Sequence, residues 1–196
     1  MKRLAGTLIG LLFAIGVQAQ TSYPMLMTLQ PIAIQIGTTG ELEVQSRYSM
    51  WGATRVIISG EGLTGEVVHP ELPPAKEGEK PTEPSLTTLK IKFTATPDAA
   101  PGVREFKLLT PRGVSTVGQI VVTRDKVVFE DIKSDSSENA VAFEIPATLT
   151  GVIEKGEDRD YFKFSIDAPT QLVFHCRCMR LQDRIHDLQK HADPMI

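Results

Sequence analysis

The strongest constraint on the fold is a repeated alternation of apolar and polar residues with a period of two. In the stretch LKIKFTA, Leu89, Ile91 and Phe93 share one face, while Lys90 and Lys92 share the other. The stretches ELEVQSRY and YFKFSI alternate in the same way. Because successive side chains of a strand point to opposite sides of a sheet, this pattern predicts short strands that are buried on one face.

Glycine and proline turn signals separate these stretches, as in GTTG at residues 37–40 and PRG at residues 111–113. Short strands with closely spaced turns are typical of an antiparallel β-sandwich. We therefore expect an all-β fold of two antiparallel β-sandwiches. A short C-terminal helix is also expected, because Leu181, Ile185 and Leu188 recur at helical spacing.

The chain divides into two expected units. A first sandwich covers residues 23–124, a polar linker covers 125–140, and a second, incomplete sandwich covers 141–196. The stretch HPELPPAKEGEKPTEP at residues 69–84 contains five prolines and predicts an exposed, solvated loop between strands of the first unit. The predicted core of the first unit consists of Leu42, Val44, Ile57, Leu89, Ile91, Phe93, Phe106 and Leu108.

The N-terminus has the order of features found in a secretory signal peptide. Lys2 and Arg3 precede an apolar run at residues 4–17, and small residues follow near Ala19. This order predicts a signal peptide at residues 1–19 that is cleaved after Ala19, with an uncleaved anchor as the alternative. No later segment is long and apolar enough to span a membrane. The expected location is secreted, periplasmic or on the cell surface.

Charge and cysteine content exclude further classes. The net charge of -3 without a basic stripe argues against nucleic acid as a partner. Two cysteines are too few for a disulfide-stapled scaffold, so the fold must be stabilised by its hydrophobic core.

The C-terminal stretch CRCMRLQDRIHDLQKHADPMI holds Cys176, Cys178, His186 and His191, which raises the question of a metal or catalytic site. The single residue between the cysteines is shorter than structural zinc sites use, and histidines five residues apart diverge on a helix. In QLVFHCRCM both cysteines share a face with Leu172 and Phe174. We therefore predict that they are buried core residues rather than metal ligands or catalytic thiols.

Two other motifs resemble enzyme signatures only in part. GEGLTG at residues 60–65 matches the dinucleotide-binding glycine pattern, but a strand-like stretch rather than a helix follows it, which predicts a turn. GVSTVG at residues 113–118 misses the spacing of a nucleophile elbow. We predict no catalytic residues in this chain.

The segment EIPATLTGVIEKGEDRDYFKFSIDAPTQLVFHCRCMRL resembles the opening of the pre-peptidase C-terminal (PPC) domain of secreted bacterial proteins. The preceding PDAAPGVREFKLLTPRGVS resembles the last strands of an immunoglobulin-like (Ig-like) domain of the IPT/TIG type. This tandem implies an Ig-like sandwich followed by a jelly-roll-like one, and we expect the chain to be a fragment that ends inside the PPC domain. The residues that carry the PPC resemblance are the DRDYFKF block, the QLVFHC stretch, Pro146, Gly151, Ile153, Arg180, Asp193 and Pro194.

The resemblance also implies a candidate calcium site. Some PPC domains, notably the collagen-binding ones of bacterial collagenases, bind calcium through acids of a segment that often reads Glu-x-Glu-Pro-Asn-Asp. Here Ile132 and Ser134 replace the second acid and the asparagine. Calcium takes six to eight oxygen ligands. The candidate ligands are Glu130, Asp135, Asp158 and Asp160, and the alternative is that the last two cap a turn. No other cofactor is expected.

These features together favour a non-catalytic, secreted pair of β-sandwich modules. The expected role is presentation, adhesion or binding of extracellular protein or polysaccharide. The alternative is that the chain is the N-terminal accessory portion of a larger secreted peptidase or other hydrolase.

Overall fold

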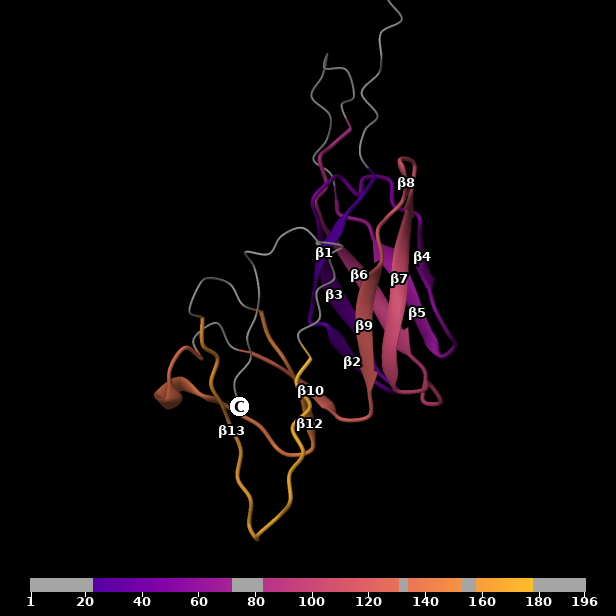
Figure 1. The fold of residues 1–196 in the computed structure, drawn as a ribbon. Helices are drawn as coiled ribbons and strands as arrows, with labels where there is room; N and C mark the ends of the chain where they lie inside the picture. The colour runs from indigo at the N-terminus through magenta and orange to yellow at the C-terminus, as the bar shows by residue number, and fades with distance from the viewer. Residues whose placement is uncertain (1–22, 72–82, 131–133, 153–157, 178–196) are drawn as a thin grey trace, which may run out of the picture.

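A computed structural model describes residues 23–71, 83–130, 134–152 and 158–177 of the chain (Figure 1). The predicted signal peptide and C-terminal helix lie outside these residues. Apart from one short 3-10 turn, η1 (Ser137–Asn139), the regular elements in the described ranges are all strands. The all-β expectation is therefore confirmed.

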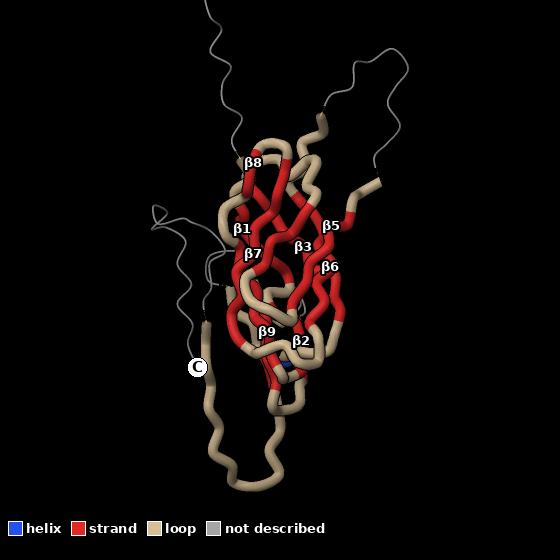
Figure 2. Tube along the Cα trace, turned by 90° about the vertical axis from the view of Figure 1, so that its right-hand side faces the viewer, coloured by secondary structure: helices blue, strands red, loops and turns tan. Residues whose placement is uncertain are grey.

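Two sheets form a sandwich from residues 26–123. The first sheet has the order β1-β3-β6-β5, and all of its pairs are antiparallel. Its strands are β1 (Leu26–Gln30), β3 (Thr39–Ser46), β5 (Leu63–Val68) and β6 (Thr88–Ala95). Figure 2 shows the strands running along the long axis of the sandwich.

The second sheet has the order β2-β9-β7-β4, with β8 paired to β7. Its pairs are antiparallel except for β2 and β9, which run parallel. Its strands are β2 (Ala33–Gln35), β4 (Arg55–Ile58), β7 (Gly102–Thr110), β8 (Gly113–Val114) and β9 (Gly118–Thr123). Apart from the short parallel β2–β9 pair, these two sheets confirm the antiparallel sandwich predicted for the first unit.

The core between the sheets follows the alternation seen in the sequence. Leu89, Ile91 and Phe93 of β6 are buried, and Phe93 meets Phe106 of β7 edge to face with ring centroids 5.4 Å apart. Such aromatic pairs contribute beyond the area that they bury. The prediction that Ile57 is a core residue is wrong, because Ile57 is 44 % exposed. In β4 the neighbouring Val56 points inward, so Ile57 faces solvent.

Gly60 and Gly62 of the GEGLTG motif lie in the turn between β4 and β5, whereas residues 63–65 begin β5. Gly62 has a φ of 81°, a left-handed conformation that favours glycine. A Cβ there would also lie 2.6 Å from the Cα of Ala99, so the close approach of this loop requires a glycine. The motif is therefore structural.

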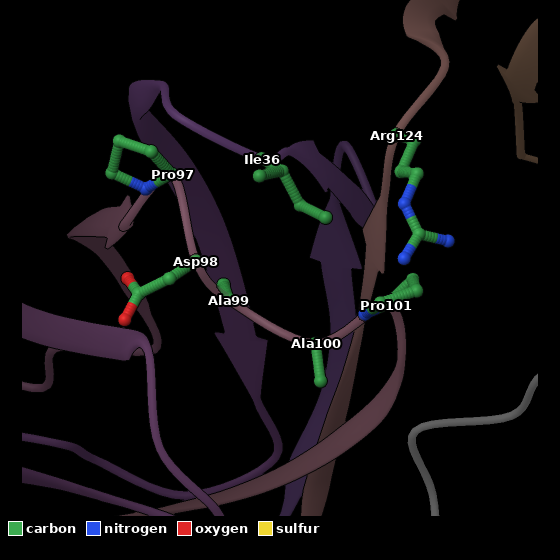
Figure 3. Close-up of a pocket in the computed structure, with 7 residues that line it drawn as sticks. All are labelled: Ile36, Pro97, Asp98, Ala99, Ala100, Pro101 and Arg124. Atoms are coloured by element: carbon green, nitrogen blue, oxygen red, sulfur yellow. The ribbon is translucent and has the colours of Figure 1, made fainter.

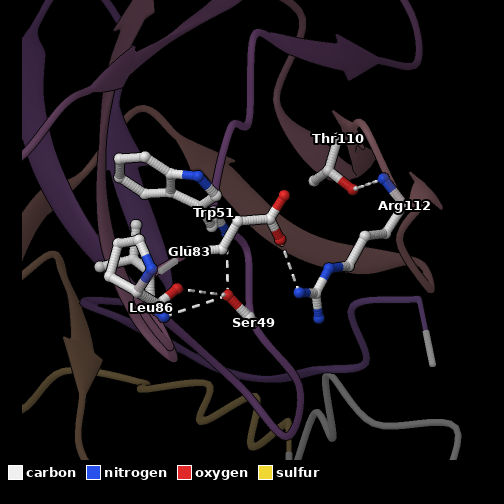
Figure 4. A network of polar contacts seen from close by, with 7 residues as sticks. Ser49, Trp51, Glu83, Leu86, Thr110 and Arg112 are labelled. Carbon is white, nitrogen blue, oxygen red and sulfur yellow. Dashed lines mark hydrogen bonds and ion pairs between the residues drawn. The ribbon is translucent and has the colours of Figure 1, made fainter. Parts of the chain in front are cut away.

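A polar network fixes one end of the sandwich beside the proline-rich stretch (Figure 4). Ser49 Oγ accepts hydrogen bonds from the backbone N–H groups of Trp51 (3.2 Å) and Leu86 (3.1 Å). Arg112 pairs with Glu83 at 2.8 Å. Glu83 is largely exposed, so this ion pair contributes little to stability. The network attaches residues 83–86 to the body of the sandwich.

In the C-terminal unit, defined here as residues 126–177, the described residues form two small parallel sheets. β10 (Lys126–Phe129) pairs with β12 (Ala147–Thr150), and β11 (Val141–Ala142) pairs with β13 (Phe162–Lys163). β10 therefore lies inside the stretch that we expected to be a linker. A 2.9 Å hydrogen bond between the hydroxyl groups of Thr123 and Thr148 connects this unit to the sandwich.

The prediction that Cys176 is a buried strand residue is wrong. Residues 171–177 form no strand, and Cys176 is exposed. Its neighbours Val173 and Phe174 are 88 % and 54 % exposed. Alternation places residues on a common face, but burial also needs a second layer over that face, and none covers this stretch among the described residues. Cys178 lies outside the described residues.

Candidate functional site

A group of carboxylates at the end of β10 is the candidate site, and it begins with Glu130. The N–H of Glu130 donates to Thr150 O at 3.0 Å and so extends the β10–β12 pairing by one residue. Its side chain turns back toward the next residues after β12, where the N–H of Val152 donates to Glu130 Oε1 at 2.6 Å. The Glu130 carboxyl thereby joins the ends of both strands.

Gly151 makes room for this carboxyl group. A Cβ at position 151 would lie 2.9 Å from Glu130 Cδ and would overlap Oε2. Contacts this short to a bonded, partly buried group cannot be relieved without moving the Glu130 side chain. Position 151 therefore requires glycine, the residue without a side chain.

Ser134 connects the second acidic segment to the site. It is fully buried, its Oγ donates to Asp160 Oδ1 at 3.3 Å, and its carbonyl accepts from the N–H of Tyr161 at 2.9 Å. Sequence reasoning treated Ser134 as a lost ligand. In the structure it positions Asp160, a role that a single hydroxyl in a polar stretch does not signal.

The environment raises the pKa of Glu130 to about 7. Burial is the largest cause, because it penalises the charged form, and the Val152 N–H opposes this by stabilising the anion. The Asp160 side chain raises the pKa further as a hydrogen-bond acceptor for the protonated acid, and the charges of Asp160 and Asp158 add to the rise. Glu130 Oε2 is buried and has no partner in normal hydrogen-bond geometry among the described residues.

Of the four sequence-predicted residues, Asp160 and Asp158 are near enough to Glu130 to raise its pKa. Asp135 is exposed and is not among the groups that shift the Glu130 pKa. Chemically, this arrangement holds a proton near neutral pH on one member of an acidic group.

The fit of this group to calcium is incomplete. One oxygen of Glu130 is already used by the Val152 N–H, whereas calcium takes six to eight oxygen ligands. Within the described ranges, no group of three or more His, Cys, Asp or Glu side chains is arranged to hold a metal ion. The calcium ligand set stays a prediction, and no chemistry is assigned through a metal here.

A second feature is a cleft at one end of the sandwich, with a volume of about 520 Å³. Figure 3 shows Asp98 and Arg124 on opposite sides of it, with Ile36 between them. A hydrogen bond from the Thr96 side chain lowers the pKa of the exposed Asp98. The remaining lining residues are Pro97, Ala99, Ala100 and Pro101.

The serine of GVSTVG has a structural role. Ser115 is buried, its Oγ accepts from the N–H of Leu108 at 2.8 Å, and it donates to Thr116 O at 2.7 Å. A hydroxyl group that is enclosed and doubly bonded in this way has no access to a substrate. His186 and His191 lie outside the described residues.

A scan against protein-family models finds none that matches the chain, and a search of curated proteins finds no match. Among the described residues, there is also no helix with the length and apolar character needed to cross a membrane.

Proposed function

We propose that the protein is a non-catalytic, extracytoplasmic β-module that binds or presents partner molecules. The PPC-like and Ig-like resemblances and the signal-peptide pattern support export and a modular role. The proposal extends to extracellular protein or polysaccharide as the partner class.

One observation carries the proposal: large apolar side chains lie on the surface although the sandwich core is already filled. In the sandwich these are Ile57, Leu109 and Val114, each more than a third exposed. Grouped exposed apolar residues mark interaction sites more often than chance. In the C-terminal unit the corresponding residues are Phe129, Ile145, Leu149, Ile166, Val173 and Phe174.

The test has two arms. The full chain is expressed in a bacterium with an outer membrane, the exported product is weighed by mass spectrometry, and its binding to insoluble polysaccharides and to immobilised extracellular proteins is measured. In parallel, casein and a chromogenic ester report hydrolysis. We expect export with cleavage after Ala19, saturable binding to at least one surface, and no turnover. Hydrolysis that follows the protein through purification, or an absence of binding to every surface, would refute the proposal.

A further inference from the structure

We infer that the outer face of β4, β7 and β8 is a docking surface for a protein segment that combines aliphatic and acidic side chains. This inference rests on the proposed binding function and names the surface and the chemistry of the partner. The docking face is defined as Arg55, Ile57, Lys107, Leu109 and Val114.

Strand register places these five side chains next to one another. Ile57 lies opposite Lys107, Arg55 lies opposite Leu109, and Leu109 lies opposite Val114 on β8. The inward positions of β7, Phe106, Leu108 and Thr110, are buried, so the alternate positions face outward. Directly opposed residues on one face of an antiparallel pair are neighbours, and diagonal ones remain within reach of long side chains.

The apolar members of this face depart from the pattern of the opposite sheet. On the outer face of β3, β5 and β6 the exposed positions carry Glu41, Glu66, Lys90 and Lys92. On the docking face Ile57, Val114 and Leu109 are 44 %, 42 % and 37 % exposed. The solvent face of an antiparallel sheet is commonly polar. Three neighbouring aliphatic residues on that face are unfavourably exposed to water unless a partner covers them.

The cations on the face define the charge of that partner. Arg55 and Lys107 are exposed, and neither belongs to an ion pair among the described residues, where the pairs are Lys90–Glu41 and Arg112–Glu83. The chain as a whole has a net charge of -3, so these cations run against its overall charge. Glu105 lies on the same face of β7, two residues before Lys107. Aliphatic side chains interleaved with free cations complement a surface of aliphatic side chains interleaved with carboxylates.

A protein segment fits better than a sugar or a membrane. Burying aliphatic side chains is favourable when they pack against other apolar surface. The hydroxyl face of a polysaccharide and an inorganic anion do not offer such a surface. Membrane-surface elements bury their apolar side chains several ångströms into the headgroup boundary. Here the aliphatic residues alternate with Arg55 and Lys107 on one face of paired strands. This arrangement favours an extended protein segment whose apolar and acidic side chains also alternate.

The experiment uses the full chain and short synthetic peptides. One peptide alternates Leu and Glu, one alternates Leu and Lys, and one alternates Ser and Glu; vesicles that contain phosphatidylserine form the fourth arm. Affinity is measured by fluorescence anisotropy of labelled peptides and by vesicle sedimentation. We expect the Leu/Glu peptide to bind about tenfold or more tightly than each of the other probes. Equal binding of the Ser/Glu peptide, stronger binding to vesicles, or no binding of the Leu/Glu peptide overturns the inference.

Two variants and a matched control locate the surface. Ile57→Ser with Leu109→Ser should weaken Leu/Glu binding by about tenfold, and Arg55→Glu with Lys107→Glu should transfer the preference to the Leu/Lys peptide. Lys92→Glu, on the opposite sheet, should leave both affinities unchanged, and an equal loss there refutes the location. Trp51 fluorescence during urea unfolding confirms that each variant is folded. If only the peptides fail while a surface from the first panel still binds, the docking face is wrong and the binding function stands.

Discussion

Replacing Glu130 by Gln should remove a pH dependence from the stability of the C-terminal unit. The pKa of Glu130 rises from its ordinary value of 4.5 to about 7, chiefly because of burial. A raised folded-state pKa contributes stability that is fully present below the unfolded pKa and is lost as the pH rises through the folded pKa. The unit should therefore lose stability between pH 4.5 and about 7.

The size of the effect follows from this interval. Each pH unit between the two pKa values corresponds to about 1.4 kcal/mol, so full conversion would give about 3.4 kcal/mol. Because Glu130 is only partly buried, solvent screening reduces this to about 1 kcal/mol. Above pH 7 the Gln variant, which carries no charge, should be more stable than the wild type by about that amount.

Urea unfolding at about pH 5 and about pH 8, followed through NMR signals of β10 and β12, measures the difference. Trp51 fluorescence reports the sandwich in the same samples and should show no Glu130-dependent change. Glu144→Gln, at an exposed position, controls for the loss of one negative charge. If the Gln variant keeps the pH dependence of the wild type, or if the ¹³C shift of the Glu130 carboxyl titrates at or below pH 4.5, the proposed electrostatics of the site are wrong.

Three further results are expected. Gly118→Ala places a Cβ 2.5 Å from Phe106 Cζ and should destabilise the sandwich by about 1–3 kcal/mol in urea unfolding, whereas Gly40→Ala, whose nearest contact is 3.4 Å, should cost less; equal losses would contradict this. Ser115→Ala leaves the buried N–H of Leu108 without its partner and should cost about 1–3 kcal/mol by the same assay; no loss would contradict it. Amide hydrogens of β10 and β12 should exchange faster than those of β6, because their small sheet has few buried side chains; equal protection would disprove this.

The acidic site shows how much of a site can be predicted from sequence. Glu130, Asp158 and Asp160 were named as candidate ligands from a resemblance, and in the structure the two aspartates raise the pKa of Glu130. Where Glu130 lies depends on the pairing of β10 with β12. The buried role of Ser134 and the space left by Gly151 have no sequence signal, because both arise from segments that are distant along the chain.

The sequence by itself determined the long alternating strands of the sandwich and most of its core. In β6, Leu89, Ile91 and Phe93 alternate with lysines, and a strand with one apolar face has only one orientation that removes that face from water. Every partner sheet would bury the same residues. The turn at Gly60 and Gly62 was predictable for a similar local reason, since glycine alone readily adopts the backbone conformation found there.

Only the tertiary structure decided the positions where local pattern allows two answers. Val56 and Ile57 are adjacent apolar residues, so alternation cannot say which one points inward, and the pairing of β4 with β7 places Ile57 outside. Cys176 shares a face with apolar residues, yet it is exposed because no described layer covers that face. Burial is a property of two surfaces in contact, and the sequence of one strand specifies only one of them.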